Sequence, residues 1–213
     1  MAMRFRDRVD AGRQLADRVD DLDLTAPVIL AMPRGGVPVA APIAAALGAP
    51  LDVFVVRKVG APGRPELGVG AVAEGLDAPV VNDVARQLGL SADQVRRLAV
   101  TSAEELSRQV LAYRGDLPMT GIGGRDVVLV DDGLATGVTA AAGLRALRNL
   151  HPRTVCFAAP VCARQSLSRI QALADSVVAV LLADDLHSVG EWYDDFTQTD
   201  DAEVIRLLRA GRR

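Results

Sequence analysis

Residues 127–139, VVLVDDGLATGVT, give the clearest indication of the fold of this chain. This stretch begins as a continuous apolar run, which is typical of a strand buried on both faces of a parallel sheet. Two adjacent carboxylates, Asp131 and Asp132, follow it directly, and a loop of small residues then opens a helical pattern. The succession of strand, loop and helix indicates an α/β fold with an anion-binding turn.

Similar apolar runs recur along the chain, and most are followed by a helical pattern. Strands are predicted over residues 27–32, 51–56, 126–130, 154–159 and 176–182. Helices are predicted within residues 37–48, 139–150 and 164–174. Because strands and helices alternate, we predict an α/β protein built on a doubly wound parallel sheet.

The segment between the second and third predicted strands breaks this alternation. Residues 60–75, GAPGRPELGVGAVAEG, are rich in glycine and proline and are predicted to form a long loop. A charged helix is predicted within residues 91–115, with Ser91 as its N-cap, and a short final helix begins near Asp200 or Asp201. No linker or repeat divides the chain. We therefore predict one domain over residues 1–213, with a core at about 22–182 and a tail at about 183–213.

Composition narrows the class of protein. The chain has 213 residues, of which 50% are hydrophobic and 24% charged, as in ordinary globular domains. Its net charge of −3 gives no electrostatic reason to expect nucleic-acid binding, and no apolar run approaches the roughly 20 residues of a membrane span. Cys156 and Cys162 have no histidine-rich neighbourhood, so two reduced thiols are favoured over a metal site. We expect a cytoplasmic protein without nucleic-acid or membrane partners.

The acidic pair and the loop after it could bind two chemically different groups of one ligand. Ligands of open α/β sheets bind at the carboxyl ends of the strands. There Asp131 and Asp132 can accept hydrogen bonds from a vicinal diol and help to hold a divalent cation. The loop offers two glycines, two threonine hydroxyls and the amides of a helix N-terminus to a phosphate. A ribose 5-phosphate unit has both of these groups.

The same stretch resembles the phosphoribosyl-pyrophosphate signature of the type I phosphoribosyltransferases. Both have an apolar strand, an acidic pair, three residues and Thr-Gly-x-Thr, and the order of elements fits over about residues 31–182. The resemblance implies that Mg²⁺ binds at Asp131 and Asp132, and that Asp132 takes part in catalysis. The donor-binding residues that it implies here are Asp131, Asp132, Gly133, Ala135, Thr136, Gly137, Val138 and Thr139.

Residues 32–36, MPRGG, resemble the family's pyrophosphate loop. The resemblance implies that Arg34, Gly35 and Gly36 bind the pyrophosphate, Arg34 with a fixed positive charge and the glycines with exposed amides. It also implies a non-proline cis peptide bond at Arg34–Gly35 or its neighbour.

Residues 55–75 resemble the end of the family's second strand and the flexible loop that closes over the site. Arg57 and Lys58 would face pyrophosphate oxygens, and Lys58 would stabilise the leaving group. Glu74 falls at the position of the catalytic glutamate of the adenine enzymes, where it would take a proton from the attacking nitrogen. Glu66 is the competing candidate, and the alternative for both glutamates is that they are solvated loop charges.

The tail segment EWYDDF, residues 191–196, corresponds to the small C-terminal hood that contacts the acceptor base in this family. Trp192, Tyr193 and Phe196 would stack on the base, because aromatic faces stack well on heterocycles. The alternative is that they anchor the final segment to the core.

The sequence does not identify the base that would accept the ribose 5-phosphate. Ala135 stands where the hypoxanthine–guanine enzymes carry an aspartate, which argues against a 6-oxopurine, and DDGLATGVT is close to the DDLLATGGT of the adenine enzymes. The chain resembles a set of bacterial members of this family marked by PRGG, VRK, DDGLATG and the tail motif VGEWYDDF. We expect an Mg²⁺-dependent, homodimeric phosphoribosyltransferase. The alternative is a regulator that senses phosphoribosyl pyrophosphate or a nucleotide without turnover.

Overall fold

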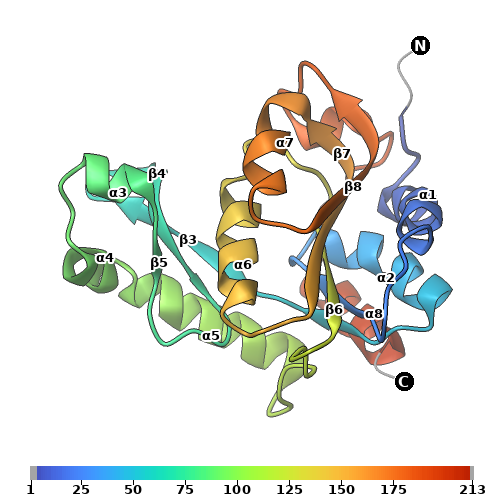
Figure 1. The fold of residues 1–213 in the computed structure, drawn as a ribbon, viewed down its shortest axis with the longest axis horizontal. Helices are drawn as coiled ribbons and strands as arrows, with labels where there is room; N and C mark the ends of the chain where they lie inside the picture. The colour runs from blue at the N-terminus through green and yellow to red at the C-terminus, as the bar shows by residue number, and fades with distance from the viewer. Residues whose placement is uncertain (1–3, 212–213) are drawn as a thin grey trace.

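A computed structural model describes residues 4–211 and contains a central sheet of five parallel strands. The strands lie in the order β2-β1-β6-β7-β8, of which β6, β7 and β8 are labelled in Figure 1. Their bounds are β1 (Val28–Ala31), β2 (Leu51–Val53), β6 (Asp126–Val130), β7 (Thr154–Ala163) and β8 (Ser176–Ala183). Every residue of β1 and β6 is buried, as expected for continuous apolar runs at the centre of a sheet. The predicted doubly wound α/β fold is confirmed.

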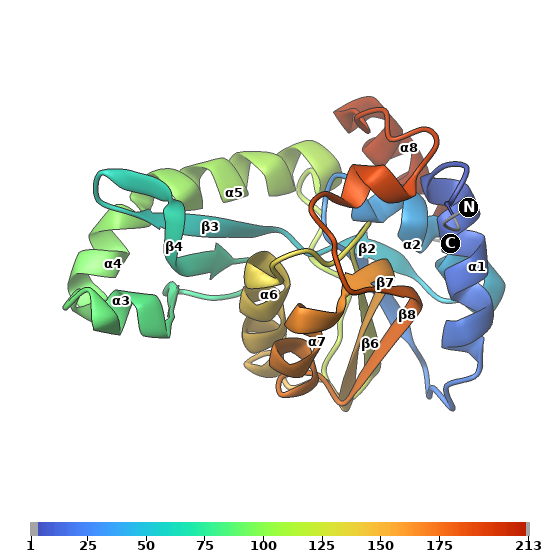
Figure 2. The same cartoon turned by 90° about the horizontal axis from the view of Figure 1, so that it is seen from above.

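Helices cover both faces of this sheet (Figures 1 and 2). The helices α1 (Arg8–Asp20), α2 (Gly36–Leu47) and α8 (Asp201–Gly211) pack on one face, and α6 (Val138–Arg148) and α7 (Arg164–Gln171) on the other. Successive residues of β1 point to opposite sides, so that Ile29 joins the first layer and Leu30 the second. Leu15 of α1 and Val204 of α8 are fully buried in the first layer. The core therefore extends beyond the predicted range 22–182 at both ends.

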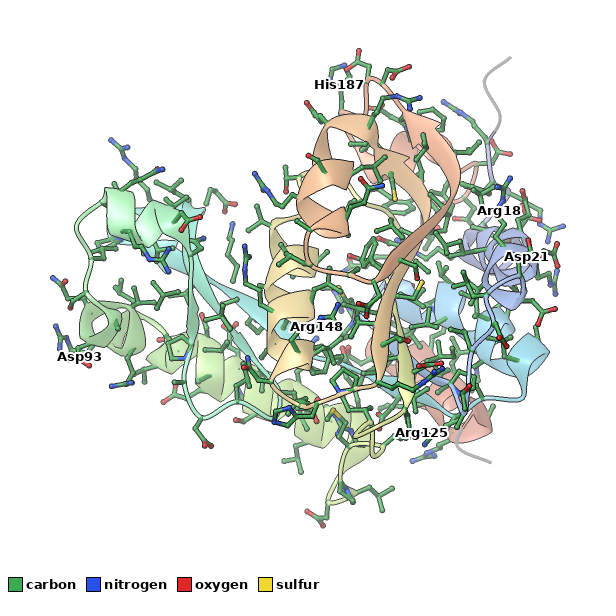
Figure 3. All side chains as sticks on the ribbon, in the orientation of Figure 1. Arg18, Asp21, Asp93, Arg125, Arg148 and His187 are labelled. Carbon is green, nitrogen blue, oxygen red and sulfur yellow. The ribbon has the colours of Figure 1, made fainter. Side chains whose placement is uncertain are left out.

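The segment between β2 and β6 forms an insertion that projects from the central sheet (Figures 1 and 2). It contains an antiparallel sheet of β3 (Val56–Ala61), β4 (Arg64–Ala73) and β5 (Val80–Val81), followed by α3 (Asp83–Gln87), α4 (Ala92–Leu98) and α5 (Val100–Arg114). The labels of Asp93 and Arg18 in Figure 3 mark opposite ends of the molecule, in the insertion and in α1. Val59, Val69 and Val95 form a small core that belongs to the insertion.

The prediction of a long loop over residues 60–75 is wrong, because these residues form the β3–β4 hairpin. Its glycines allow strands to approach closely. A Cβ on Gly60 would lie 2.5 Å from the carbonyl oxygen of Pro65, and one on Gly70 would lie 2.6 Å from that of Val80. Gly63 has a φ of +69° in the turn. The glycine content that indicated a loop therefore serves strand pairing.

Two other boundaries differ from the predictions. The predicted strand 51–56 is divided, because β2 ends at Val53 and β3 begins at Val56 in the second sheet. The predicted helix within 91–115 is two helices that meet at Ala99. Ser91 caps α4 through a capping box with Gln94, and α8 begins at Asp201, so both predicted helix starts are confirmed. No helix among residues 4–211 is long and apolar enough to cross a membrane.

Candidate functional site

The acidic pair lies at the carboxyl end of β6, near the middle of the central sheet. The Oδ1 atom of Asp131 accepts a hydrogen bond of 2.9 Å from the backbone N–H of Asp132. Removal from water, with the neighbouring Asp132 charge, raises the pKa of Asp131 well above its ordinary value. Removal from water also raises the pKa of Asp132, although Arg8 opposes this shift. Two mutually repelling carboxylates do not stabilise a core, so their position favours a ligand site.

Arg8 of α1 contacts this pair and was not anticipated from the sequence. Its Nε and Nη2 atoms both lie 2.9 Å from Oδ2 of Asp132, and the two side chains are only 10% and 18% exposed. The two residues are 124 positions apart, and no local pattern links them. The site therefore includes the N-terminal helix.

The loop between Asp132 and α6 is shaped for an anion. Gly137, directly before the helix, has a φ of +68°, which favours glycine. A Cβ on Gly133 would lie 2.4 Å from Cγ1 of Val189, so only glycine fits there. Leu134 is buried beneath the loop, while Thr136 and Thr139 are exposed. Two exposed hydroxyl-bearing residues therefore flank the start of α6, whose first N–H groups have no partner within the helix and can donate to an anion.

The second predicted loop, residues 32–36, lies directly against the acidic pair. A Cβ on Gly35 would lie 1.9 Å from Oδ2 of Asp132, and one on Gly36 would lie 2.6 Å from the carbonyl oxygen of Val130. The peptide bond between Pro33 and Arg34 is cis, at the neighbour of the predicted position. The structure therefore brings both predicted loops together at one edge of the sheet.

Arg57 and Lys58 are neighbours on β3, so their side chains point to opposite faces of the hairpin. Arg57 lines a cavity of about 640 Å³ together with Arg34 and with Arg108 of α5. Lys58 lines a cavity of about 590 Å³ that also includes Thr136 and Thr139. The sequence analysis predicted that both side chains face the pyrophosphate, whereas in the structure they line two different cavities. Arg108 was not predicted as a site residue, because it lies on helix α5, far in the sequence from the two motifs that marked the site.

Residues 6–195 match the family model described as the phosphoribosyl transferase domain. The chain belongs to this family. It is 42% identical to the protein TT1426 from Thermus thermophilus, whose crystal structure matches with a TM-score of 0.89 over 99% of this chain and 100% of that one. It is also 41% identical over 212 residues to Rv0571c of Mycobacterium tuberculosis H37Rv, whose name assigns it provisionally to the phosphoribosyl transferases. That match covers 98% of this chain and 47% of the relative, so the chain spans about half the length of the curated relatives it matches.

A more distant structure shows the fold alone. The purine phosphoribosyltransferase of Pyrococcus horikoshii Ot3 is 16% identical to this chain, with a TM-score of 0.50 over 94% of this chain and 97% of that one. The type I phosphoribosyltransferase fold is thus shared with low sequence identity.

Glu74, which the sequence resemblance suggested as the catalytic glutamate, is not found in an open loop. It directly follows β4, is 12% exposed and forms an ion pair with Arg114 of α5. Burial raises the pKa of Glu74, and Arg114 opposes this shift. Glu74 lines a separate cavity of about 340 Å³ beside α5, whereas Glu66 lines the Lys58 cavity and lies 3.2 Å from Lys58 Nζ. The structure therefore places Glu66, and not Glu74, in the cavity that Thr136 and Thr139 also line.

The aromatic side chains of the tail pack with Phe5 from the other end of the chain. Tyr193 is 3% exposed, and its ring centroid lies 5.4 Å from that of Phe5 and 5.0 Å from that of Phe196. Its hydroxyl donates a 2.6 Å hydrogen bond to the carbonyl oxygen of Asp132. Trp192 and Phe196 are half-buried in the same cluster. These contacts support the anchoring alternative for Tyr193, whose ring offers no free face to a base.

Metal-ligating side chains are sparse in the described part of the chain. Residues 4–211 contain no group of three or more histidine, cysteine, aspartate or glutamate side chains that could hold a metal ion. Cys156 and Cys162 are free and buried, and burial raises the pKa of their thiols to about 11 and about 12. A divalent cation at Asp131 and Asp132 would therefore take its remaining ligands from a bound molecule and water.

Proposed function

We propose that this protein is a phosphoribosyltransferase that moves ribose 5-phosphate from phosphoribosyl pyrophosphate to a nitrogen of a base and releases pyrophosphate. One observation carries the proposal. The acidic pair lies against the loop of residues 32–36 on one side and continues into the anion-shaped turn of residues 133–139 on the other. A diol flanked by two anionic groups matches this arrangement, and phosphoribosyl pyrophosphate has that order of groups.

Each part of the donor has a matching group of residues in this placement. The 5′-phosphate binds the turn before α6, close to the cavity that contains Lys58 and Thr139. The ribose diol donates hydrogen bonds to Asp131 and Asp132. The pyrophosphate extends into the cavity that contains Arg34 and Arg57.

The reaction breaks the bond between the anomeric carbon and a pyrophosphate oxygen, and the electron pair leaves with the pyrophosphate. The base nitrogen forms the new bond to that carbon and loses its proton. Arg34 and Arg57 stabilise the charge that develops on the leaving group. Glu66 of the hairpin accepts that proton in this proposal, because it lines the cavity next to the turn that binds the 5′-phosphate.

Mg²⁺ is part of this proposal. Asp131 and Asp132 fit a cation that binds through one or two carboxylates and completes its coordination with donor oxygens and water. When bound, it neutralises charge on the pyrophosphate. The acceptor is a nitrogenous base, and half-buried Trp192 and Phe196 are its candidate contacts.

The test is the double variant Asp131→Asn with Asp132→Asn. We expect loss of binding of phosphoribosyl pyrophosphate in the presence of Mg²⁺, measured by titration calorimetry, with an unchanged circular dichroism spectrum. The chain offers a matched control in Asp184 and Asp185, another adjacent pair directly after a strand, whose side chains are both 81% exposed. Asp184→Asn with Asp185→Asn is expected to bind the donor as the unaltered protein does. Unchanged donor affinity in the first variant would reject the ribose site.

Turnover separates the transferase from the sensing regulator. Pyrophosphate release is followed with the donor and a panel of purine, pyrimidine and pyridine bases. Release that depends on one base supports the transferase and identifies its acceptor, whereas donor binding without release under any base supports the sensor. A cytoplasmic homodimer remains part of the proposal, and light scattering on the purified chain tests the dimer.

A further inference from the structure

Arg8 holds the acidic pair more firmly than a surface ion pair would. Its side chain is 10% exposed, and two of its nitrogens contact a single oxygen, Oδ2 of Asp132. We propose that Arg8 is a built-in counter-ion and positioning residue of the acidic pair, so that the N-terminal helix is part of the donor site. This inference rests on the proposed function for the identity of the donor, but not for the charge balance.

Arg8 is itself fixed by the C-terminal tail. Its Nη1 atom donates a 2.8 Å hydrogen bond to the carbonyl oxygen of Thr197, and its guanidinium carbon lies 3.8 Å from the ring centroid of Phe196. The backbone N–H of Phe5 donates to the carbonyl oxygen of Trp192 at 2.9 Å, and that of Asp194 donates to Phe5 at 2.8 Å. The segment before α1 and the tail are therefore paired, and together they present the guanidinium to Asp132.

The carboxylate of Asp132 is oriented by these contacts. Oδ2 accepts a hydrogen bond from Nε of Arg8 and also lies 2.9 Å from its Nη2, while Oδ1 accepts none from any other residue among 4–211. The hydroxyl of Tyr193 holds the backbone of the same residue at 2.6 Å. One oxygen is therefore left for a ligand, in a direction set by a planar guanidinium that cannot lose its charge.

Removal of Arg8 is expected to change the affinity for Mg²⁺ alone and the affinity for the donor in opposite directions. Two carboxylates and one guanidinium leave a single net negative charge at the site. Without Arg8, two negative charges would attract a bare divalent cation more strongly, whereas the diol of the donor would lose an oriented acceptor. A residue with only a structural role would weaken both ligands together or neither.

The experiment uses Arg8→Gln and Arg8→Lys, with Arg13→Gln as the matched control, since Arg13 lies exposed on the same helix. Two titrations are performed on each protein: MgCl₂ alone, and phosphoribosyl pyrophosphate at saturating Mg²⁺. For Arg8→Gln we expect Mg²⁺ alone to bind about tenfold more tightly and the donor about tenfold more weakly. Arg8→Lys keeps the charge but lacks the planar fork, so its Mg²⁺ affinity stays near that of the unaltered protein while donor binding recovers only in part.

The proposal is overturned if Arg8→Gln shifts both affinities in the same direction, or leaves either one unchanged. It is also overturned if Arg8→Lys matches Arg8→Gln in the Mg²⁺ titration. Failure of the proposed function has a different signature. In that case the unaltered protein fails to bind phosphoribosyl pyrophosphate, and the Mg²⁺ titrations alone still decide the role of Arg8.

Discussion

Arg8 and Arg114 both lie on helices and both pair with carboxylates in or directly after strands, yet their surroundings differ. Arg114 contacts Asp52 of β2 at 3.2 Å and also pairs with Glu74 after β4. The side chains of Arg114 and Asp52 are 1% and 0% exposed. The second oxygen of Asp52 accepts hydrogen bonds from the N–H and the hydroxyl of Thr120, at 2.9 and 3.0 Å. The Arg114 network is thus shut off from water.

The two networks differ in whether the carboxylate has an oxygen left for a further partner. Arg114 joins the last helix of the insertion to a strand of the central sheet and to the end of the hairpin. Arg8 instead leaves an oxygen of Asp132 unused, beside a loop that is shaped for an anion. The same pairing of residue types fixes an insertion in one place and, in our proposal, orients a carboxylate for a ligand in the other.

The largest effect is expected from Arg114→Leu. This change leaves Asp52 and Glu74 buried near each other without their cation, and breaking a buried pair in this way destabilises a protein by about 3–5 kcal/mol. Urea denaturation measures the loss. The control is Arg148→Leu (Arg148 is labelled in Figure 3), because Arg148 pairs with Asp175 at 2.9 Å while the two side chains are 40% and 46% exposed. That change is expected to alter the free energy of unfolding by less than about 1 kcal/mol. Equal effects of the two changes would contradict the comparison.

A smaller effect, and a sharper distinction, is expected from the two glutamates of the insertion. Glu74→Gln weakens a hydrogen-bonded charge pair and is expected to lower the free energy of unfolding by about 1–3 kcal/mol, with kcat within a few-fold. Glu66 is 97% exposed, so Glu66→Gln is expected to leave stability unchanged and to lower kcat by at least about a hundredfold. Denaturation and pyrophosphate release are measured on both variants. A large loss of kcat in Glu74→Gln alone would restore the role inferred from the family alignment.

What the sequence predicted well is encoded locally. Residues 127–139 contain a strand, the acidic pair, the turn and the start of a helix without interruption, so neighbouring positions define the whole unit. The same holds for MPRGG after β1, and for the start of α4, where Ser91 and Gln94 form a capping box. The strands of the central sheet were likewise readable, because each is an uninterrupted apolar run or nearly so, and β1 and β6 are buried throughout.

What the sequence did not predict depends on contacts between distant positions. Arg8 and Asp132 are 124 residues apart, and Arg8 reads locally as one more charge on an amphipathic helix. Gly60 and Gly70 indicated a loop, but their role is set by the carbonyl groups that approach them from neighbouring strands. Glu74 matched a family position by alignment, while its burial against Arg114 follows from how α5 folds back on the hairpin.

The smallest effect concerns the start of α1 and tests how Arg8 is held. Asp7 caps this helix, since its Oδ1 atom accepts a 2.7 Å hydrogen bond from the N–H of Asp10, and this bond is the main cause that lowers the pKa of Asp7. Asp7→Ala is expected to destabilise the protein by about 1 kcal/mol at neutral pH. Because the folded pKa lies below the ordinary value of 3.8, the contribution of the cap is fully present above that value and is lost as the pH falls through the folded pKa. Denaturation at neutral and at acid pH should therefore show the variant and the unaltered protein converging in stability below pH 3.8. The control Asp17→Ala, at an exposed site on the same helix, should differ little from the unaltered protein at either pH.

Donor affinity should fall less in Asp7→Ala than in Arg8→Gln, since the contacts of Arg8 with Thr197 and Phe196 remain. An equal loss would mean that the helix start, and not the tail, positions the guanidinium.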